Sequence, residues 1–451
     1  MKILFLRLVA FALVCVSFLA VQPIAAQPAD DTQAKQVIIF GRHGVRTPVL
    51  PNSVLDAFSV QPYPVFPGVP AGRAGIAVIT PNGVTDETIL GSYFHLWLKQ
   101  EGLLTGNDSA DANLVYFRAN DTPLILGTAQ AFWSGMLPAA GPPNVNVVSP
   151  GSDPLFDPVD AGVALLDYQK AVAAVNGRLG SNPSALATAY APELALTRSV
   201  LLGYPFNDAA APPAPANVTD VTNFTANPIT ATAGSSSVPV NLGGLEQVIY
   251  AIDPFVMEYT DGLPMAQVGW GQLTSGNIGQ IFRLYDLLLN LEYRTPYLDQ
   301  VQSSNVASHI VRSLVQAATG NQMSGALATP SSKVVVLIAS NTNISGLAGL
   351  FQLDWLLPSY QPDVSAPSGV LMFELRQSQT TGEYIVRTSY VAQTMDQLRN
   401  LTPLTLDAPP ASAPVFIPGC SAGNATFDCP LGKFVSIANQ VIDPHSADLV
   451  N

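Results

Sequence analysis

The sequence predicts an α/β fold. Three short apolar runs, rich in β-branched residues, lie far apart along the chain at Gln36–Phe40, Leu114–Phe117 and Val334–Ala339, and helical patterns separate them. Separated strands with helices between them are typical of a parallel sheet covered on both faces. The 451 residues, 48% of them hydrophobic, provide enough chain for a large core.

The remaining elements follow the same logic. Apolar residues recur at helical spacing over Thr85–Leu103 and Thr128–Leu137. Near the end of the chain, Val370–Leu375 and Tyr384–Gln393 flank Thr380–Gly382, which predicts an antiparallel hairpin at a sheet edge.

The middle of the chain has a different composition. Helical patches at Ala161–Gly177 and Pro183–Leu201 precede Asp208–Pro239, a stretch rich in Pro, Ala, Ser, Thr and Asn. This stretch is either a disordered linker or the long surface loop of a cap subdomain. The predicted limits are 1–26 for a signal peptide, 27–145 and 266–451 for an α/β core, and 146–265 for an inserted cap.

Charged residues make up only 11% of the chain, with 19 Lys and Arg against 32 Asp and Glu and a net charge of −13. A nucleic-acid partner requires a positive surface, so we expect none. An acidic chain is also poorly suited to an anionic membrane surface. If the protein binds phosphate, its few cations must be concentrated in one place.

The amino terminus has the features of a secretory signal. Lys2 and Arg7 accompany an apolar run at Leu8–Ala20, and Pro23–Ala26 supplies a helix breaker and small residues. We expect cleavage after residue 26 and export to the periplasm or the medium, with an uncleaved anchor as the alternative. No later segment has 18 uninterrupted apolar residues, so we expect no membrane span after cleavage.

Cys15 lies within the signal segment, which leaves Cys420 and Cys429. An even count in an exported protein predicts a disulfide that closes a short loop. The pair lacks nearby His ligands and is a poor zinc site. The sequence contains no other cluster with metal-ligand spacing, so we expect no metal or cofactor.

The segment Gly41–Pro48 (GRHGVRTP) follows the first predicted strand directly. His43 would then lie at the carboxyl end of a strand, where open α/β sheets bind ligands. Arg42 and Arg46 flank it, and guanidinium groups match phosphate oxygens. A neutral imidazole can attack phosphorus and carry the phosphoryl group. The alternative is an ordinary surface loop, but the position after a buried strand favours a functional site.

The residues RHGVRTP at Arg42–Pro48 resemble the signature of the histidine acid phosphatases, the phytase-containing branch of the histidine phosphatase superfamily. Further segments resemble the same family in the same order: Ile76–Leu104, Val115–Ala129, Leu263–Pro264, Gly269–Gly271, Val334–Trp355 and Cys420–Cys429. The chain looks closest to the bacterial periplasmic phytases and glucose-1-phosphatases. The resemblance implies a phosphoglycerate-mutase-like three-layer α/β core with a mainly helical cap subdomain.

The resemblance also implies roles for single residues. His43 matches the nucleophile that becomes phosphohistidine, and Arg42 and Arg46 match phosphate-binding arginines, with Thr47 in the same loop. The implied activity is cofactor-independent hydrolysis of phosphate monoesters. The implied partner is a small phosphate ester or another anion.

Three positions depart from the family pattern. Leu124 stands where a third phosphate-binding arginine is expected, and Arg118 is the nearest cation. Ser340 replaces a phosphate-contacting histidine, and Asn341 replaces the aspartic acid that protonates the leaving oxygen. A carboxamide cannot serve as a general acid, and such catalysis contributes roughly 10²–10⁴ in rate.

Glu258 is the first candidate for a substitute acid. Three functions therefore remain open from the sequence. The first is an exported histidine acid phosphatase with weak or altered activity. The second is a pseudophosphatase that binds a phosphorylated or other anionic ligand without efficient turnover. The third is an enzyme adapted to a different ester or transfer reaction.

Overall fold

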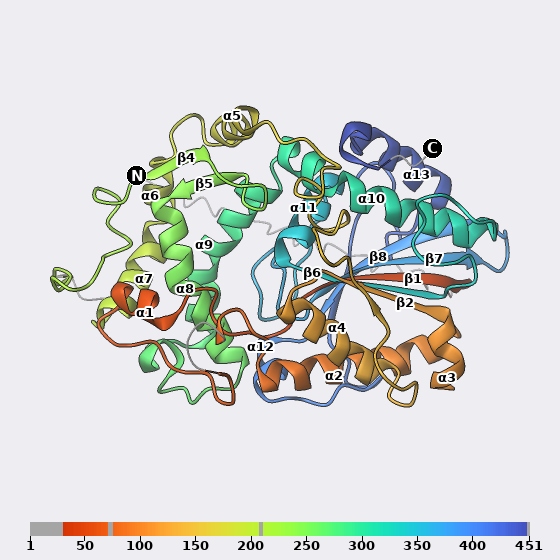
Figure 1. Ribbon diagram of the computed structural model, residues 1–451, viewed down its shortest axis with the longest axis horizontal. Coiled ribbons are helices and arrows are strands. Elements are labelled where there is room, and N and C mark those ends of the chain that lie inside the picture. Colours follow the sequence, from red (N-terminus) through yellow and green to blue (C-terminus); the bar gives the residue numbers. More distant parts are fainter. Residues whose placement is uncertain (1–29, 71–74, 207–210, 449–451) are drawn as a thin grey trace, which may run out of the picture. The chain divides into compact units, whose positions relative to one another are not determined.

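The computed structural model describes residues 30–70, 75–206 and 211–448 (Figure 1). The predicted signal peptide over 1–26, including Cys15, lies outside the described residues. The strands are β1 Thr32–Arg42, β2 Val115–Ala119, β3 Val145–Asn146, β4 Ile229–Ala233, β5 Val240–Gly243, β6 Val334–Ala339, β7 Val370–Ser378, β8 Tyr384–Ala392, β9 Ala411–Pro414 and β10 Cys429–Pro430. The helices are α1 Asn52–Leu55, α2 Pro81–Gln100, α3 Asp108–Asp111, α4 Pro123–Met136, α5 Tyr168–Arg178, α6 Ala185–Ala189, α7 Ala191–Leu202, α8 Gly244–Thr260, α9 Ser275–Tyr293, α10 Pro296–Thr319, α11 Asn341–Phe351, α12 Met395–Arg399 and α13 Leu431–Val441.

The main sheet has the strand order β10-β8-β7-β1-β6-β2-β3, and β9 also pairs with β8. The strands β1, β6, β2 and β3 are parallel, whereas β7 and β8 continue the sheet in antiparallel fashion. The three predicted strands are confirmed, and β6 has the predicted bounds. The predicted hairpin also exists, but its place at a sheet edge is wrong, because β9 and β10 both pair with the outer side of β8.

Both faces of the sheet are covered by helices, as the fold prediction requires (Figure 1). Side chains alternate along β1, so that Ile38 and Phe40 pack in one hydrophobic cluster with residues of α10, α11 and α13. Val37 and Ile39 point the other way and pack with residues of α2 and α4. Two buried faces explain why residues 37–40 of β1 and the whole of β6 are continuous apolar runs rather than an alternating pattern. The three-layer α/β core is confirmed.

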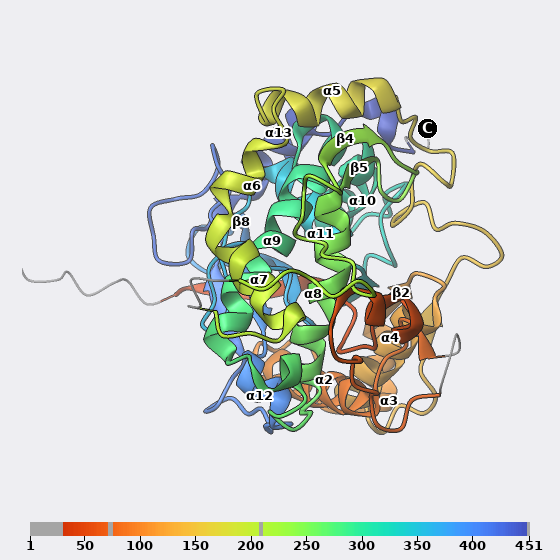
Figure 2. The ribbon, with the colours of Figure 1, turned by 90° about the vertical axis from the view of Figure 1, so that its left-hand side faces the viewer.

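A second helical region contains α5, α7, α8, α9 and the small β4-β5 sheet (Figure 2). Its hydrophobic cluster joins Val200 of α7, Val248 and Ile252 of α8, and Ile281 and Leu284 of α9. The core of this region thus extends into α9, past residue 265, where the sequence predicted the cap to end. The strand β4 lies within the stretch that the sequence predicted to be a linker or a loop.

The predicted disulfide between Cys420 and Cys429 is present, with Cα atoms 5.3 Å apart. It ties the segment before β10 to the sheet, since Cys429 pairs with Val386 of β8. Within the described ranges, no helix combines the length and apolar character that a membrane crossing requires.

Candidate active site

The loop that carries His43 is fixed at the carboxyl ends of two strands. The amide of His43 donates a hydrogen bond to the carbonyl of Ala339 at the end of β6, at 3.0 Å. The amide of Ser368 donates to the carbonyl of His43 at 3.2 Å. Glycine at residue 44 makes room for Glu87, because a Cβ there would lie 2.8 Å from its Oε1. The backbone therefore holds the imidazole at one defined place.

The His43 side chain is buried, and its Nδ1 lies 3.0 Å from the carbonyl oxygen of Gly44. A carbonyl only accepts hydrogen bonds, so we assign the proton to Nδ1 and a free lone pair to Nε2. Burial, followed by the charges of Arg42 and Arg46, holds the pKa of His43 well below 6.5. The imidazole is therefore neutral and nucleophilic at physiological pH.

His43 lines a cavity of about 380 Å³ that α4, α8, α9 and α11 surround. Five of the residues that the sequence analysis singled out meet there: His43, Arg46, Leu124, Ser340 and Asn341. These residues come from three distant segments of the chain. The cavity therefore contains the proposed nucleophile together with all three positions that depart from the family pattern.

Two helices begin at the wall of this cavity. Thr122 is the N-cap of α4 and Ser340 is the N-cap of α11, and both line the cavity. Helix N-termini carry partial positive charge and N–H groups without partners inside the helix. They favour an anion in this cavity even though Leu124 and Ser340 bring no cation.

Arg46 is paired inside the protein. Its Nη1 and Nη2 each donate to a carboxylate oxygen of Asp253 on α8, at 2.8 Å, and both side chains are buried. Burial alone would lower the pKa of Arg46, but the Asp253 carboxylate raises it above its ordinary value. The guanidinium is therefore charged, and its bidentate face is occupied by a carboxylate.

Arg42 lies behind the cavity rather than in its wall. It lines a narrow neighbouring cavity with Asp286 and Tyr285, and its Nη1 donates to the carbonyl of Ser365 at 2.5 Å. Tyr285 lines both cavities. Arg42 thus contributes positive charge near His43 without forming part of the described wall.

Asn341 and Ser340 are both engaged in local hydrogen bonds. Nδ2 of Asn341 donates to the hydroxyl of Tyr285 at 3.1 Å. The hydroxyl of Ser340 donates to Oδ1 of Asn343 at 2.7 Å. Neither side chain is a titratable acid, so the wall next to His43 offers hydrogen bonds and no general acid at these two positions.

A family model for the histidine phosphatase superfamily (branch 2) matches residues 33–391. The chain belongs to this family. The phytase AppA of Escherichia coli K12 is 25% identical over 426 residues, which cover 94% of this chain and 95% of that protein. The glucose-1-phosphatase of Salmonella typhimurium is 25% identical over 409 residues, covering 90% and 92%.

Solved structures of this family give the same result. The phytase of Hafnia alvei in complex with tartrate superposes with a TM-score of 0.80 at 27% identity, covering 93% of this chain and all of that one. The same phytase in complex with myo-inositol hexakis sulphate gives a TM-score of 0.79 at 26% identity, with 93% and 100% coverage. The phosphatase fold is therefore shown over nearly the whole chain.

Two predicted binding residues lie away from the cavity. Arg118 is held by Asp153, whose two carboxylate oxygens accept from its Nε at 2.8 Å and its Nη2 at 2.7 Å. The ion pair neutralises this guanidinium, and Arg118 does not line the cavity. Arg118 is therefore an unsuitable replacement for the arginine that Leu124 lacks.

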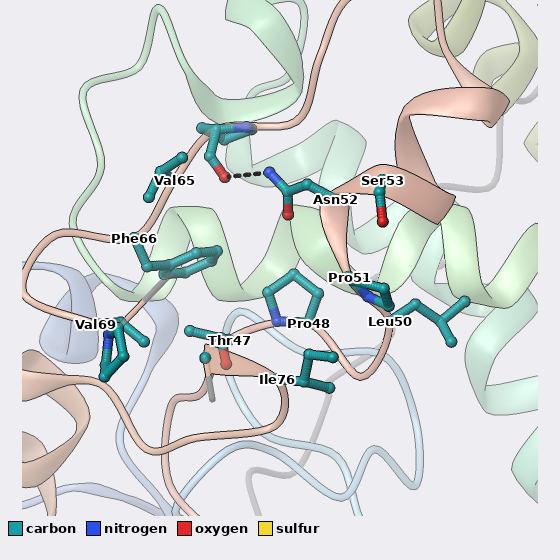
Figure 3. Close-up of a pocket in the computed structure, with 13 residues that line it drawn as sticks. Thr47, Pro48, Leu50, Pro51, Asn52, Ser53, Val65, Phe66, Val69 and Ile76 are labelled. Carbon is teal, nitrogen blue, oxygen red and sulfur yellow. Dashed lines mark hydrogen bonds between the residues drawn. The ribbon is translucent and has the colours of Figure 1, made fainter. Parts of the chain in front are cut away.

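Thr47 faces a different cavity, of about 290 Å³, together with Pro48, Phe66 and Ile76 (Figure 3). In that cavity Asn52 donates to the carbonyl of Pro64 at 3.4 Å (Figure 3). None of the described residues that line it is an acid, a base or a cation. Thr47 is thus not among the described residues that line the cavity of His43.

Glu258 also lies outside the wall around His43. The side of α8 that faces the cavity carries Glu246, Tyr250 and Asp253, and Glu258 is five residues further along, on another face of the helix. Its Oε2 accepts from the amide of Gly269 at 2.9 Å. The carboxyl group is buried in a structural contact, so Glu258 is incorrectly placed for a substitute acid.

The residues of the cavity wall that the sequence analysis missed include Glu246, Asp253, Tyr285 and Glu292. A signal was present, since Glu246 and Asp253 are seven residues apart in an apolar segment, and that spacing puts both acids on one face of a helix. Their contact with residues of α9 depends on long-range packing, which no local pattern reveals.

Proposed function

We propose that the protein hydrolyses small phosphate monoesters through a phosphohistidine on His43, at a rate reduced by the absence of the usual acid. The observation that carries this proposal is the buried neutral imidazole of His43, whose Nε2 is free, in a cavity bounded by Arg46 and two helix N-termini. Family membership supports the same reaction class.

In the first step, the lone pair of Nε2 attacks phosphorus and the bond from phosphorus to the ester oxygen breaks. The departing oxygen takes a proton, and water must supply it, because Asn341 donates hydrogen bonds but no proton. In the second step, water attacks the phosphorus of phosphohistidine, the P–N bond breaks, and inorganic phosphate leaves. The proton of that water passes to solvent, so His43 returns to its neutral state.

The second candidate function is a pseudophosphatase that binds an anion without efficient turnover. The ion pair between Arg46 and Asp253 favours it, because a bound phosphate would meet a guanidinium that a carboxylate already occupies. Leu124 and Asn341 remove a further cation and the acid from the same wall.

The same proposal includes export of the protein and its division into a core and a cap. Residues 1–26 would be removed during export to the periplasm or the medium, where the disulfide between Cys420 and Cys429 can form. The helical region around α8 would act as a cap over His43, since Glu246 and Asp253 of α8 line the cavity.

The test compares an aryl and an alkyl ester, p-nitrophenyl phosphate and glycerol 2-phosphate, across acidic to neutral pH. The aryl leaving group departs without much help from a proton, so we expect it to be turned over faster. His43→Ala should abolish turnover of both esters, and acid quenching of the wild type during turnover should trap phosphohistidine. A folded wild-type protein that binds phosphate but hydrolyses neither ester overturns this proposal in favour of the pseudophosphatase.

A further inference from the structure

Two carboxyl groups lie in the cavity at a distance from the proposed phosphate position. The helices α8 and α9 pack side by side, with Asp253 and Tyr285 at one level near His43. Glu246 precedes Asp253 by seven residues and Glu292 follows Tyr285 by seven. Seven residues are about two turns, or roughly 10 Å, so the second pair lies about that far along the helices from the first.

Glu246 and Glu292 form a pair. Their carboxyl groups contact each other within hydrogen-bonding distance, and both line the cavity. Glu292 is only 2% exposed, and its Oε1 accepts no hydrogen bond from an amide, hydroxyl or guanidinium group of the described residues. Glu292 therefore lines the cavity and carries a buried carboxyl group that lacks a full set of donors, and a ligand with a donor group would satisfy it.

The surroundings of the pair are acidic and aromatic. Tyr250 and Tyr293 line the cavity beside it, and the hydroxyl of Tyr293 donates to the carbonyl of Ser237 at 2.8 Å. Burial, followed by the charge of Glu246, raises the pKa of Glu292 well above its ordinary value. Among the described residues of this cavity wall, the guanidinium of Arg46 is the only Arg or Lys side chain, and Asp253 neutralises it.

These observations identify the chemistry that fits this part of the cavity. A second phosphate group would meet carboxylates and no free cation, which disfavours polyphosphorylated substrates. A protonated amine would supply the missing donors and charge, and tyrosine side chains are common partners of ammonium groups. We infer that Glu246 and Glu292 form a subsite for an ammonium group, so that the substrate is the phosphate monoester of an amino sugar or a similar amino alcohol. This inference rests on the proposed function, because it takes the phosphate to lie at His43.

Glucosamine 6-phosphate and glucose 6-phosphate test the inference, because they differ in a single ammonium group. We expect wild-type kcat/KM to favour the amine by at least tenfold. In the double variant Glu246→Gln/Glu292→Gln this ratio should fall to within about twofold of unity. The control Glu383→Gln/Asp407→Asn removes two exposed acids and should retain the preference. Single variants and melting temperatures establish that each protein is folded.

A binding measurement distinguishes failure of the ammonium subsite from failure of the proposed hydrolysis. In His43→Ala, titration calorimetry should give a Kd at least tenfold lower for glucosamine 6-phosphate than for glucose 6-phosphate. That preference without any wild-type hydrolysis supports the subsite and overturns the proposed function. Hydrolysis or binding of both esters with equal efficiency, or a preference that survives in the Glu246→Gln/Glu292→Gln variant, overturns the subsite. Failure of His43→Ala to bind either ester also overturns it.

Discussion

Asp253 binds both terminal nitrogens of Arg46, at 2.8 Å each, inside the cavity that holds His43. The guanidinium that the family signature assigns to phosphate thus has a carboxylate of the same chain as its partner. Phosphate and this carboxylate carry the same sign of charge, so we expect them to compete for the terminal nitrogens of Arg46. We therefore expect the pair to lower the affinity of the cavity for phosphate.

The first prediction concerns the substitution Asp253→Asn. Removing one partner of a buried ion pair costs about 3–5 kcal/mol of stability, because an uncompensated charge stays buried. Inorganic phosphate should then replace the lost carboxylate, so we expect roughly tenfold tighter phosphate binding than in the wild type. Melting temperatures with and without phosphate measure this, and phosphate should raise the melting temperature of Asp253→Asn by more than that of the wild type.

Asp153→Asn is a matched control, since Asp153 holds Arg118 in a similar bidentate pair away from the cavity wall. This variant should also lose stability, but phosphate should not restore it. An equal phosphate response in both variants would show that Arg46 does not take part in anion binding.

The second prediction concerns the protonation of His43. Burial and the two arginines hold the pKa of His43 well below 6.5, so the imidazole stays neutral as the pH falls through 6.5. In a sample labelled with ¹⁵N-histidine, we expect one imidazole to keep the neutral shifts with the proton on Nδ1 at a pH about one unit below 6.5. The signal is assigned by its loss in His43→Ala.

The lowered pKa of His43 also makes the stability of the protein depend on pH. The unfolded chain takes up a proton at His43 near pH 6.5, whereas the folded protein does so only at lower pH. The contribution of His43 to stability is therefore present above pH 6.5 and is lost as the pH falls toward the folded pKa. The melting temperature of His43→Gln should decline less than that of the wild type over this range, and an equal decline would contradict the assigned state.

The sequence was sufficient to predict the elements that depend on local patterns. The buried strand β6 has the bounds that its continuous apolar run predicted. The loop after β1 places His43 at the carboxyl ends of β1 and β6. The resemblance in Arg42–Pro48 also predicted the family correctly. These features depend on strand burial and on a short contiguous motif.

The sequence was insufficient for contacts between distant side chains. Nothing near Arg46 in the chain indicates that Asp253 occupies its guanidinium, because the two are more than two hundred residues apart. Glu258 and Asp253 are both acids of α8, and only the packing of that helix decides which one faces His43. Arg118 illustrates the same limit, because its partner Asp153 lies in an irregular segment.

The third prediction restores the expected family residues. Leu124, Ser340 and Asn341 line one cavity with His43, so Leu124→Arg, Ser340→His and Asn341→Asp place a cation, an imidazole and an acid around the same phosphate. We expect the triple variant to gain roughly 10²-fold or more in kcat/KM on glycerol 2-phosphate, since an acid then protonates the leaving oxygen. The gain on p-nitrophenyl phosphate should be smaller, because its leaving group needs less help.

The single variant Asn341→Asp tests the effect of the acid without the added arginine and histidine. It should increase the ratio of alkyl to aryl turnover even if the total rate changes little. A triple variant that folds but gains no activity on either ester would show that these positions do not form the catalytic wall.

The last prediction concerns Glu258, which is buried and accepts a hydrogen bond from the amide of Gly269. Burial raises the pKa of Glu258 to about 8, whereas the unfolded chain titrates this group near 4.5. The folded protein therefore retains a proton that the unfolded chain has released, and stability falls as the pH rises from 4.5 through 8. The cost at pH 7 is up to about 3 kcal/mol.

Glu258→Gln keeps an oxygen for Gly269 and removes the titration, so this variant should be at least as stable as the wild type at pH 7. Its free energy of unfolding, measured by denaturant titration, should also change less between pH 5 and 8. Because Glu258 does not line the cavity, kcat/KM on p-nitrophenyl phosphate should stay within about twofold of the wild type. If a stable Glu258→Gln protein instead loses activity by a factor approaching 10², Glu258 is the acid that protonates the leaving oxygen.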